Sequence, residues 1–247
     1  MTASPTDHNG LGYQVKRETV AVAGGADLQI RSLLDKQQFH DPQGLALALG
    51  VSSATWPLFG LVWPSAQKMA DLMQTWPLHN LRILEIGCGL ALASLVIHRR
   101  LGNVTASDCH PYTQRFLSAN LVLNDLPTMA YQSGHWARKN PQLGEFDLII
   151  GSDVLYERDH PAQLANFIQR HAANHAQVLI IDPNRGQRSA FNKHMESNGF
   201  ALSQTDILLP LHDLTPYRGR LLDFNAVSYI SMVWPSVMGV SKWLDYP

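Results

Sequence analysis

The spacing of hydrophobic residues changes along the chain and separates an N-terminal part from a larger core. Apolar and polar residues alternate over 20–22 and over 28–30, on either side of Gly24 and Gly25, and this pattern predicts a β-hairpin. Apolar residues then recur at helical spacing after Pro64, whose missing N–H is tolerated in the first turn of a helix. A hairpin is therefore expected near the N-terminus, and a helix is expected to begin at Pro64.

From residue 81 onward, short apolar runs alternate with helical patterns. The predicted strands cover 81–86, 104–106, 129–132, 146–150 and 177–181, and the predicted helices cover 90–101, 111–124, 163–173 and 187–198. The runs 148–150 and 178–181 are almost entirely apolar, which is typical of strands covered on both faces. Alternating strands and helices predict a parallel sheet, and 200–209 with 220–228 predict an antiparallel pair that closes it.

Composition and charge narrow the function classes. The 247 residues are 45% apolar, enough to bury a sizeable core, and 19 basic residues stand against 20 acidic ones. This balance lacks the positive charge that nucleic-acid binding requires, so no nucleic-acid partner is expected. The longest uncharged apolar stretch, 226–240, is shorter than the roughly 20 residues of a membrane span, so no membrane partner is expected either. Two cysteines and no secretory signal pattern predict a cytoplasmic protein.

A glycine-containing loop is expected to bind a nucleoside cofactor. Gly87-Cys88-Gly89 follows a predicted strand and precedes a predicted helix, and its two glycines allow a tight turn close to a ligand. Asp108 ends the next strand, 21 residues after Gly87, where a carboxylate can accept hydrogen bonds from both hydroxyls of a ribose. Because α/β sheets bind ligands at the carboxyl ends of their strands, this pair favours a nucleoside site over an ordinary turn.

Two positions distinguish between nucleoside cofactors. The dinucleotide fingerprint has a third glycine at the position that Leu92 occupies here. Glu85 places a carboxylate just before the loop, which disfavours a diphosphate and favours the cationic aminoacyl end of S-adenosylmethionine. The sequence therefore predicts S-adenosylmethionine as the cofactor, and a NAD-dependent oxidoreductase is a distant alternative.

Several motifs, in order along the chain, resemble those of one enzyme family. They are Leu61-Val-Trp63-Pro-Ser-Ala66, ILEIGCGLALASL at 83–95, Val104-Thr-Ala-Ser-Asp108, Asn120 with Asn124, Trp136, and Phe146-Asp-Leu-Ile-Ile-Gly-Ser-Asp153-Val-Leu-Tyr156-Glu. Over 55–224 the chain resembles the class I seven-strand methyltransferases, and within them the branch of Asp-x-x-Tyr protein lysine methyltransferases, methyltransferase family 16. The glycine loop is generic, whereas the Trp-Pro-Ser-Ala motif combined with Asp153-Val-Leu-Tyr156 is far narrower.

The resemblance implies a fold, a domain organisation and an activity. The fold would be α/β, with a Rossmann-like, doubly wound seven-stranded sheet that is mostly parallel and ends in an antiparallel C-terminal strand. The chain would consist of an N-terminal extension with a hairpin and a helix (1–55), a methyltransferase core that binds S-adenosylmethionine (56–224), and an apolar C-terminal tail (225–247). The activity would be transfer of a methyl group from S-adenosylmethionine to a lysine side chain of a protein.

Two groups of site residues follow from the matching motifs and from the charge of Glu85. The cofactor-binding group is Trp63, Glu85, Gly87, Cys88, Gly89, Asp108, Trp136 and Ser152. Within that group, Trp63 would lie against the cofactor, Asp108 would hold the ribose and Trp136 would flank the adenine. Asp153 and Tyr156 would face the target amine as the catalytic pair. The family's loop usually has another glycine where this chain has Ala91, a departure that bears on cofactor affinity.

The residues alone leave two interpretations of Asp153 and Tyr156. Asp153 could accept a hydrogen bond from the amine, with Tyr156 as an apolar or cation–π wall beside it. The default interpretation, because Asp is common at such boundaries, is that Asp153 caps the following turn while Tyr156 packs in the core. Besides protein lysine methylation, two functions stay open: a small-molecule N-methyltransferase, and a cofactor-binding module that has lost turnover. A protein target needs an open cleft over Asp153, whereas a small amine needs a segment that closes it.

A pair of histidines and the turn at 182–185 each have a functional and a structural interpretation. His171 and His175, two of 11 histidines, are expected on one helix face, but no glutamate or cysteine pair completes a metal-binding motif. Packed or solvated histidines are therefore expected, without a metal. Asp182-Pro-Asn184-Arg185 follows the fifth strand of the core on the ligand side, so Asn184 or Arg185 touches the substrate or belongs to an ordinary turn.

Overall fold

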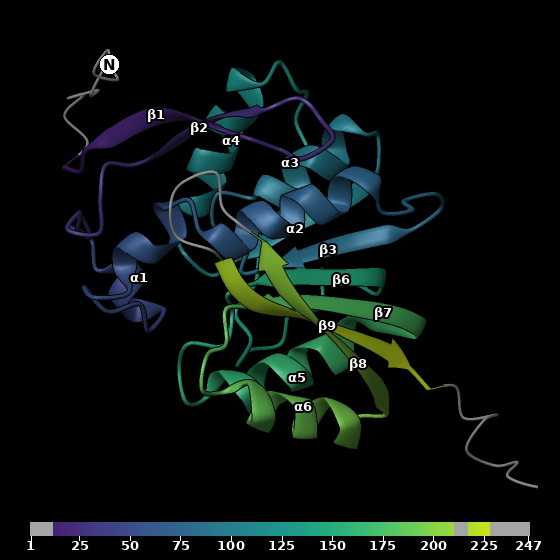
Figure 1. Cartoon of the computed structure of the whole chain (residues 1–247). Coiled ribbons are helices and arrows are strands. Elements are labelled where there is room, and N and C mark those ends of the chain that lie inside the picture. The colour runs from purple at the N-terminus through teal and green to yellow at the C-terminus, as the bar shows by residue number, and fades with distance from the viewer. Residues whose placement is uncertain (1–11, 210–216, 228–247) are drawn as a thin grey trace, which may run out of the picture.

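A computed structural model describes residues 12–209 and 217–227 and has the strand and helix order that the sequence predicts for the core (Figure 1). The strands are β1 (Val15–Val20), β2 (Leu28–Leu33), β3 (Arg82–Ile86), β4 (Asn103–Asp108), β5 (Ala130–Ser133), β6 (Phe146–Ser152), β7 (Ala172–Asp182), β8 (Phe200–Leu209) and β9 (Tyr217–Ala226). The helices are α1 (Leu45–Ala48), α2 (Pro64–Thr75), α3 (Leu92–Arg99), α4 (Thr113–Leu123), α5 (His160–His171), α6 (Arg188–Ser197) and the 3-10 helix η1 (Trp56–Gly60).

The main sheet has seven strands in the order β5-β4-β3-β6-β7-β9-β8. The strands from β5 to β7 pair in parallel, and β9 pairs antiparallel with both β7 and β8. β1 and β2 form a separate antiparallel hairpin. The predicted doubly wound sheet with an antiparallel end and an N-terminal hairpin is thus confirmed.

Helices cover both faces of the sheet (Figure 1), with α2, α3 and α4 on one side and α5 and α6 on the other. Alternate residues of β6 enter the two resulting cores: Leu148 and Ile150 pack with the first group of helices, and Ile149 packs with the second. All three are at most 1% exposed. The apolar run in this strand follows from burial on both faces, as the sequence predicts.

Asn120 on α4 and Asn124, the residue that follows the end of α4, attach the N-terminal hairpin to the core. Asn124 accepts a hydrogen bond from the backbone N–H of Gln29 at 2.9 Å and donates one to the carbonyl of Gln29 at 2.8 Å. Asn120, fully buried one turn earlier, accepts the N–H of Arg31 at 2.8 Å. These side chains provide the hydrogen bonds that another strand would offer to the outer edge of β2, so the edge is satisfied without a further strand.

The prediction that His171 and His175 share a helix face is wrong. α5 ends at His171, and Ala172 is already extended (φ −83°, ψ 128°) as the first residue of β7. The ring of His171 instead shares a 2.7 Å hydrogen bond with the carbonyl of Gly144. Most of the expected tail, residues 228–247, lies outside the described residues.

None of the helices within 12–209 and 217–227 is long and apolar enough to cross a membrane.

The buried contact of Asn120 gives a stability prediction. Asn120→Ala leaves the N–H of Arg31 without its acceptor, so we expect the free energy of unfolding to fall by about 1–2 kcal/mol in urea titrations. Gln114→Ala, an exposed substitution on the same helix, is the matched control and should change stability by less than about 0.5 kcal/mol. Equal effects of the two substitutions would show that the amide does not attach the hairpin to the core.

Candidate functional site

A cavity of about 550 Å³ lies at the carboxyl ends of β3, β4 and β6. This volume falls in the range of about 300–1,000 Å³ that small-molecule sites occupy. Nine of the ten site residues predicted from the sequence line it: Trp63, Gly87, Cys88, Gly89, Asp108, Trp136, Ser152, Asp153 and Tyr156. Residues taken from motifs up to 93 positions apart, Trp63 to Tyr156, therefore meet around one space.

The loop after β3 requires glycine at two positions. Gly87 and Gly89 both adopt left-handed backbone angles, with φ of 57° and 51°. A Cβ on Gly87 would lie 2.9 Å from a methyl group of Val154, and a Cβ on Gly89 would lie 2.9 Å from the carbonyl oxygen of Phe59. Glycine is needed here for the turn and for close packing, and the loop backbone is left open to the cavity.

Ala91 also adopts a left-handed conformation, with φ of 59°, and precedes the first residue of α3. This region costs a residue with a Cβ about 1–2 kcal/mol, which glycine avoids. The family resemblance implies a glycine at this position, and the backbone angle gives the physical reason for that preference. The chain keeps the loop conformation with alanine nonetheless.

Asp108 is fixed by the backbone around it. One carboxylate oxygen accepts the N–H of Gly89 at 3.0 Å, and the other accepts the N–H of His110 at 2.8 Å. Burial raises the pKa of Asp108 above its usual value. The carboxyl group is therefore oriented before any ligand arrives and suits the two hydroxyls of a ribose.

Glu85 lies beneath the loop and is not among the described residues that line the cavity. Its side chain is 2% exposed and accepts hydrogen bonds from the N–H of Ser94, at 2.8 Å, and from the Ser94 hydroxyl. Burial raises the pKa of Glu85 to about 7. In the structure the carboxyl group supports the first turn of α3, and its contact with a cofactor stays a prediction.

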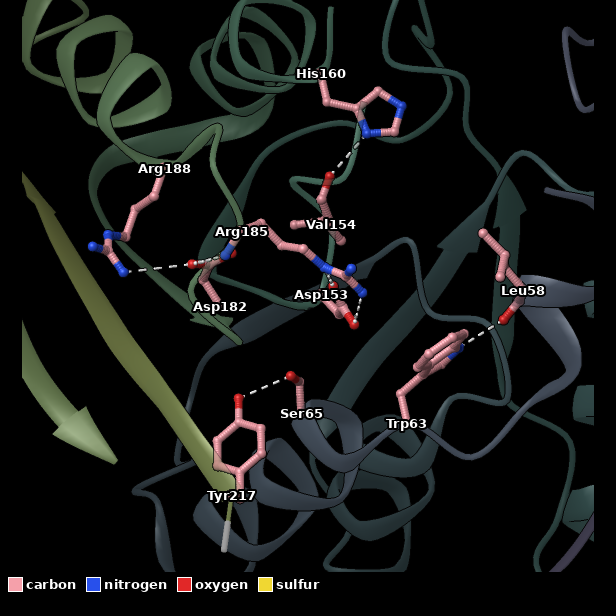
Figure 2. Close-up of polar contacts among 10 residues, drawn as sticks. All are labelled: Leu58, Trp63, Ser65, Asp153, Val154, His160, Asp182, Arg185, Arg188 and Tyr217. Carbon is pink, nitrogen blue, oxygen red and sulfur yellow. Dashed lines mark hydrogen bonds and ion pairs between the residues drawn. The ribbon is translucent and has the colours of Figure 1, made fainter. Parts of the chain in front are cut away.

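Asp153 forms an ion pair that the sequence motifs do not reveal (Figure 2). The guanidinium of Arg185 donates two hydrogen bonds to the two oxygens of Asp153, from Nε at 2.8 Å and from Nη2 at 2.9 Å. Asp153 itself has a φ of 54°, and its N–H donates to the carbonyl of Ile181 at 2.9 Å. Both residues line the cavity. Of the two interpretations of the turn that contains Arg185, the structure favours a place in the site.

Tyr156 lies beside a histidine that the motif analysis missed. The ring of His160 makes edge contacts with Tyr156 (centroids 4.7 Å apart) and with Trp136 (4.9 Å apart). Its Nδ1 lies 3.0 Å from the carbonyl of Val154 (Figure 2). His160 thus connects the predicted adenine wall to the predicted amine wall. Helical spacing from Tyr156 did not point to it, because α5 begins only at His160.

The N-terminus of α2 is held in place on the other side of the cavity (Figure 2). The indole N–H of Trp63 donates to the carbonyl of Leu58 at 2.8 Å, which fixes the ring that lines the cavity. Ser65 and Tyr217 share a buried hydrogen bond of 2.9 Å, which connects α2 to β9. The Trp-Pro-Ser-Ala motif therefore supplies both a wall of the cavity and an anchor to the sheet.

The N-terminal extension completes the cavity, and local sequence patterns did not indicate this. The residues of the extension that line the cavity are Lys36, Leu49, Gly50, Val51 and Thr55. The ammonium of Lys36 lies 5.0 Å from the ring centroid of Trp63, and the ring of His135 contacts the carbonyl of Leu49 at 3.2 Å. The extension therefore belongs to the site as well as to the fold.

Burial disfavours the thiolate form of both cysteines. Cys88 and Cys109 both line the cavity, and burial raises the pKa of Cys109 to about 12 and that of Cys88 well above its usual value. Thiols in this state are poor nucleophiles, which agrees with small buried side chains rather than reactive ones.

The burial of Glu85 predicts a pH-dependent stability. Because its pKa is raised to about 7 in the folded state, the folded chain binds a proton that the unfolded chain releases near pH 4.5. Stability attributable to this group is thus complete below about pH 4.5 and is lost as the pH rises through 7. As the pH rises from about 5 to 8, the free energy of unfolding of Glu85→Gln should increase by about 2–3 kcal/mol relative to that of the natural chain, as measured by urea unfolding. The exposed control Glu196→Gln should show no such trend; a flat difference for Glu85→Gln would contradict the raised pKa.

Comparison with known proteins supports the same family. Residues 57–198 match the lysine methyltransferase family. The electron transfer flavoprotein beta subunit lysine methyltransferases of Mus musculus and Rattus norvegicus are each 26% identical over 137 residues, which cover 54% of this chain and 53% of each relative. The chain spans about half the length of these curated relatives.

Solved structures agree in fold. A ribosomal protein L11 methylase from Lactobacillus delbrueckii subsp. bulgaricus has a TM-score of 0.52 at 17% identity, covering 68% of this chain and 81% of its own. Magnesium protoporphyrin IX methyltransferase from Synechocystis PCC 6803, solved with bound S-adenosylmethionine, has a TM-score of 0.52 at 17% identity, covering 68% and 86%. Because the family match extends over more than half of the residues, the chain belongs to the lysine methyltransferase family of S-adenosylmethionine-dependent enzymes.

Proposed function

We propose that this chain methylates a lysine side chain of a protein, using S-adenosylmethionine, and that Asp153 and Tyr156 orient the target amine. One observation carries the proposal: Asp153 and Tyr156 line the same cavity as the glycine loop and Asp108. A methyl donor bound at the loop and an amine bound at Asp153 would therefore lie in one cavity, as a direct transfer requires.

The charge of the cavity suits cationic ligands. Its lining includes four acidic residues, Asp108, Asp153, Glu157 and Asp159, and two basic ones, Lys36 and Arg185. The sulfonium of S-adenosylmethionine and the ammonium of lysine are both positive, whereas a nicotinamide dinucleotide brings a negative diphosphate. The excess of carboxylates supports the methyl donor over the dinucleotide.

The cofactor would be held by residues already oriented in the chain. Asp108 would accept the ribose hydroxyls, the backbone of Gly87 and Gly89 would lie under the aminoacyl part, and Trp63, Trp136 and Ser152 would form the surrounding walls. When bound, the cofactor supplies a methyl group on a positively charged sulfur, which is a good leaving group. The side chains around it then have to exclude water and align the amine.

The amine end of the cavity has the groups that alignment needs. A lysine amine has a reference pKa of about 10.4 and must lose a proton before its lone pair can attack. Asp153 would accept a hydrogen bond from the amine and direct the lone pair towards the methyl group. Although Tyr156 is 43% exposed as a residue, desolvation by the protein around it raises its pKa, so the phenol stays protonated beside the amine. Its ring offers a cation–π surface.

Exposure favours a protein substrate over a small amine. Tyr156 is 43% exposed, and the side chains of Arg185 and Glu157 are 42% and 51% exposed. The amine end of the cavity is therefore open, as a lysine on a protein surface requires, while the N-terminal extension covers the cofactor end. The names of the mouse and rat relatives support a lysine acceptor too. A cytoplasmic location and the absence of a nucleic-acid partner stay predictions from composition.

The test uses labelled S-adenosylmethionine, the purified chain and a dialysed lysate of its own source. Because Asp153 has a φ of 54°, asparagine is the suitable replacement, since it tolerates left-handed angles where alanine adds strain. We expect one or a few labelled protein bands, reduced by about a hundredfold or more in Asp153→Asn. Asp206→Asn is the matched control, because Asp206 also pairs with an arginine, Arg220, at 2.7 Å.

The outcomes separate the alternatives. Labelled protein that persists in Asp153→Asn would remove Asp153 from the reaction. Cofactor binding by calorimetry without labelled protein would favour a small-molecule acceptor or a module that has lost turnover. Mass spectrometry of a labelled band identifies the modified side chain, and a residue other than lysine would contradict the proposed acceptor.

A further inference from the structure

The position that the target amine would take on Asp153 already holds a cation. Both oxygens of Asp153 accept hydrogen bonds from Arg185, and the close-up shows the guanidinium facing the carboxylate (Figure 2). The Asp153 side chain is 9% exposed, whereas that of Arg185 is 42% exposed. The carboxylate is thus fixed in the cavity wall, and the guanidinium lies on the solvent side of the pair.

An arginine and a lysine ammonium compete for this carboxylate, because each brings a positive charge to it. A guanidinium stays charged at all physiological pH values, so an ammonium brought to Asp153 meets a like charge a few ångströms away. The partner that can leave is Arg185, because an ion pair with an exposed cation is weak and its side chain regains water on release. We propose that Arg185 takes the place of the substrate cation when no substrate is bound. Its guanidinium pairs with Asp153 until the target ammonium displaces it. This inference rests on the proposed function of Asp153.

The turn that carries Arg185 is shaped to present it. Asp182, at the end of β7, accepts the backbone N–H of Arg185 at 3.1 Å, and Asn184 has a left-handed φ of 64°. Arg188 lies 3.7 Å from Asp182 and supports the same carboxylate (Figure 2). Next to Arg185, a Cβ built on Gly186 would have nothing within 4 Å, so space is open beside the turn. The contacts of Asp182 with the Arg185 N–H and with Arg188 hold the turn, and the guanidinium of Arg185 can move without breaking them.

Displacement gives the site a preference among acceptors. An ammonium can replace the guanidinium charge for charge, whereas a neutral acceptor such as an alcohol leaves Asp153 with its internal partner. The same competition weakens binding of every amine by the fraction of molecules in which Arg185 occupies Asp153. Arg185 is thus a residue that determines specificity, and its removal should strengthen amine binding rather than abolish it.

The experiment measures amine binding directly and needs no turnover. The probe is n-butylamine, which reproduces the end of a lysine side chain, added to the full chain saturated with S-adenosylhomocysteine. Binding is followed by NMR titration, and the Nε–H signal of Arg185 reports displacement in the natural chain. We expect Arg185→Gln to bind n-butylamine about two- to fivefold more tightly, the range that an exposed ion pair permits. Neutral n-butanol should bind equally to both proteins.

Three variants make the comparison specific. Asp153→Asn combined with Arg185→Gln should lose the gain in amine affinity, because no carboxylate remains. Arg220→Gln breaks a comparable ion pair, with Asp206 on β8, and Arg158→Gln removes a charge next to Glu157 and Asp159; neither should change amine affinity. Thermal unfolding of each variant checks that the fold is retained.

The result can overturn the inference in two ways. Unchanged or weaker amine binding by Arg185→Gln would show that Arg185 is a fixed support of Asp153. An Arg185 Nε–H signal that does not move as the amine saturates would show the same. If amine binding tightens in Arg185→Gln and the Arg185 Nε–H signal moves in the natural chain, but no protein is ever methylated, displacement stands and only the proposed reaction fails.

Discussion

The site depends on the parallel pairing of β3 with β4 on one side and with β6 on the other. Parallel strands end at the same edge of a sheet, and the chain direction across the sheet reverses between β3 and β6, which opens a crevice at that edge. Gly87 follows β3, Asp108 ends β4 and Asp153 follows β6. The glycine loop, Asp108 and Asp153 are thus brought together by strand order, although they are separated along the chain.

Three of the six non-glycine residues with positive φ in the described part of the chain lie at the same edge. They are Ala91, Asp153 and Asn184, with φ between 54° and 64°, and they follow β3, β6 and β7. Such conformations cost about 1–3 kcal/mol each and persist where the surrounding structure holds them. At Asp153 the pairing of its N–H with Ile181 and the ion pair with Arg185 supply that support. The direction of the carboxylate into the cavity is a product of this strained turn.

Most strands and helices of the core, and part of the site, could be predicted from residue patterns. The remaining features could not, for physical reasons. Apolar runs and helical spacing indicated the strands and helices of the core, and Gly87, Gly89 and Asp108 indicated the cofactor end, because these features are local. The pair between Asp153 and Arg185 spans 32 residues and depends on strand register and on side-chain rotamers, which no local pattern encodes. The contributions of Lys36 and Leu49 depend on how the extension packs, and His175 was misplaced because one residue of extended backbone ended α5 early.

Charge connects these observations. A cavity that brings a sulfonium and an ammonium together must offset two positive charges, and each carboxylate that does so is costly to bury unless a partner balances it when the ligands are absent. Hydrogen bonds from backbone N–H groups balance Asp108, and Ser94 together with a raised pKa balances Glu85. Asp153 has an arginine instead, the only one of these three partners that carries a full charge of its own. Of these three acidic residues, Asp153 is therefore the one expected to bind a mobile substrate cation, because its partner in the structure, Arg185, is itself an exposed cation.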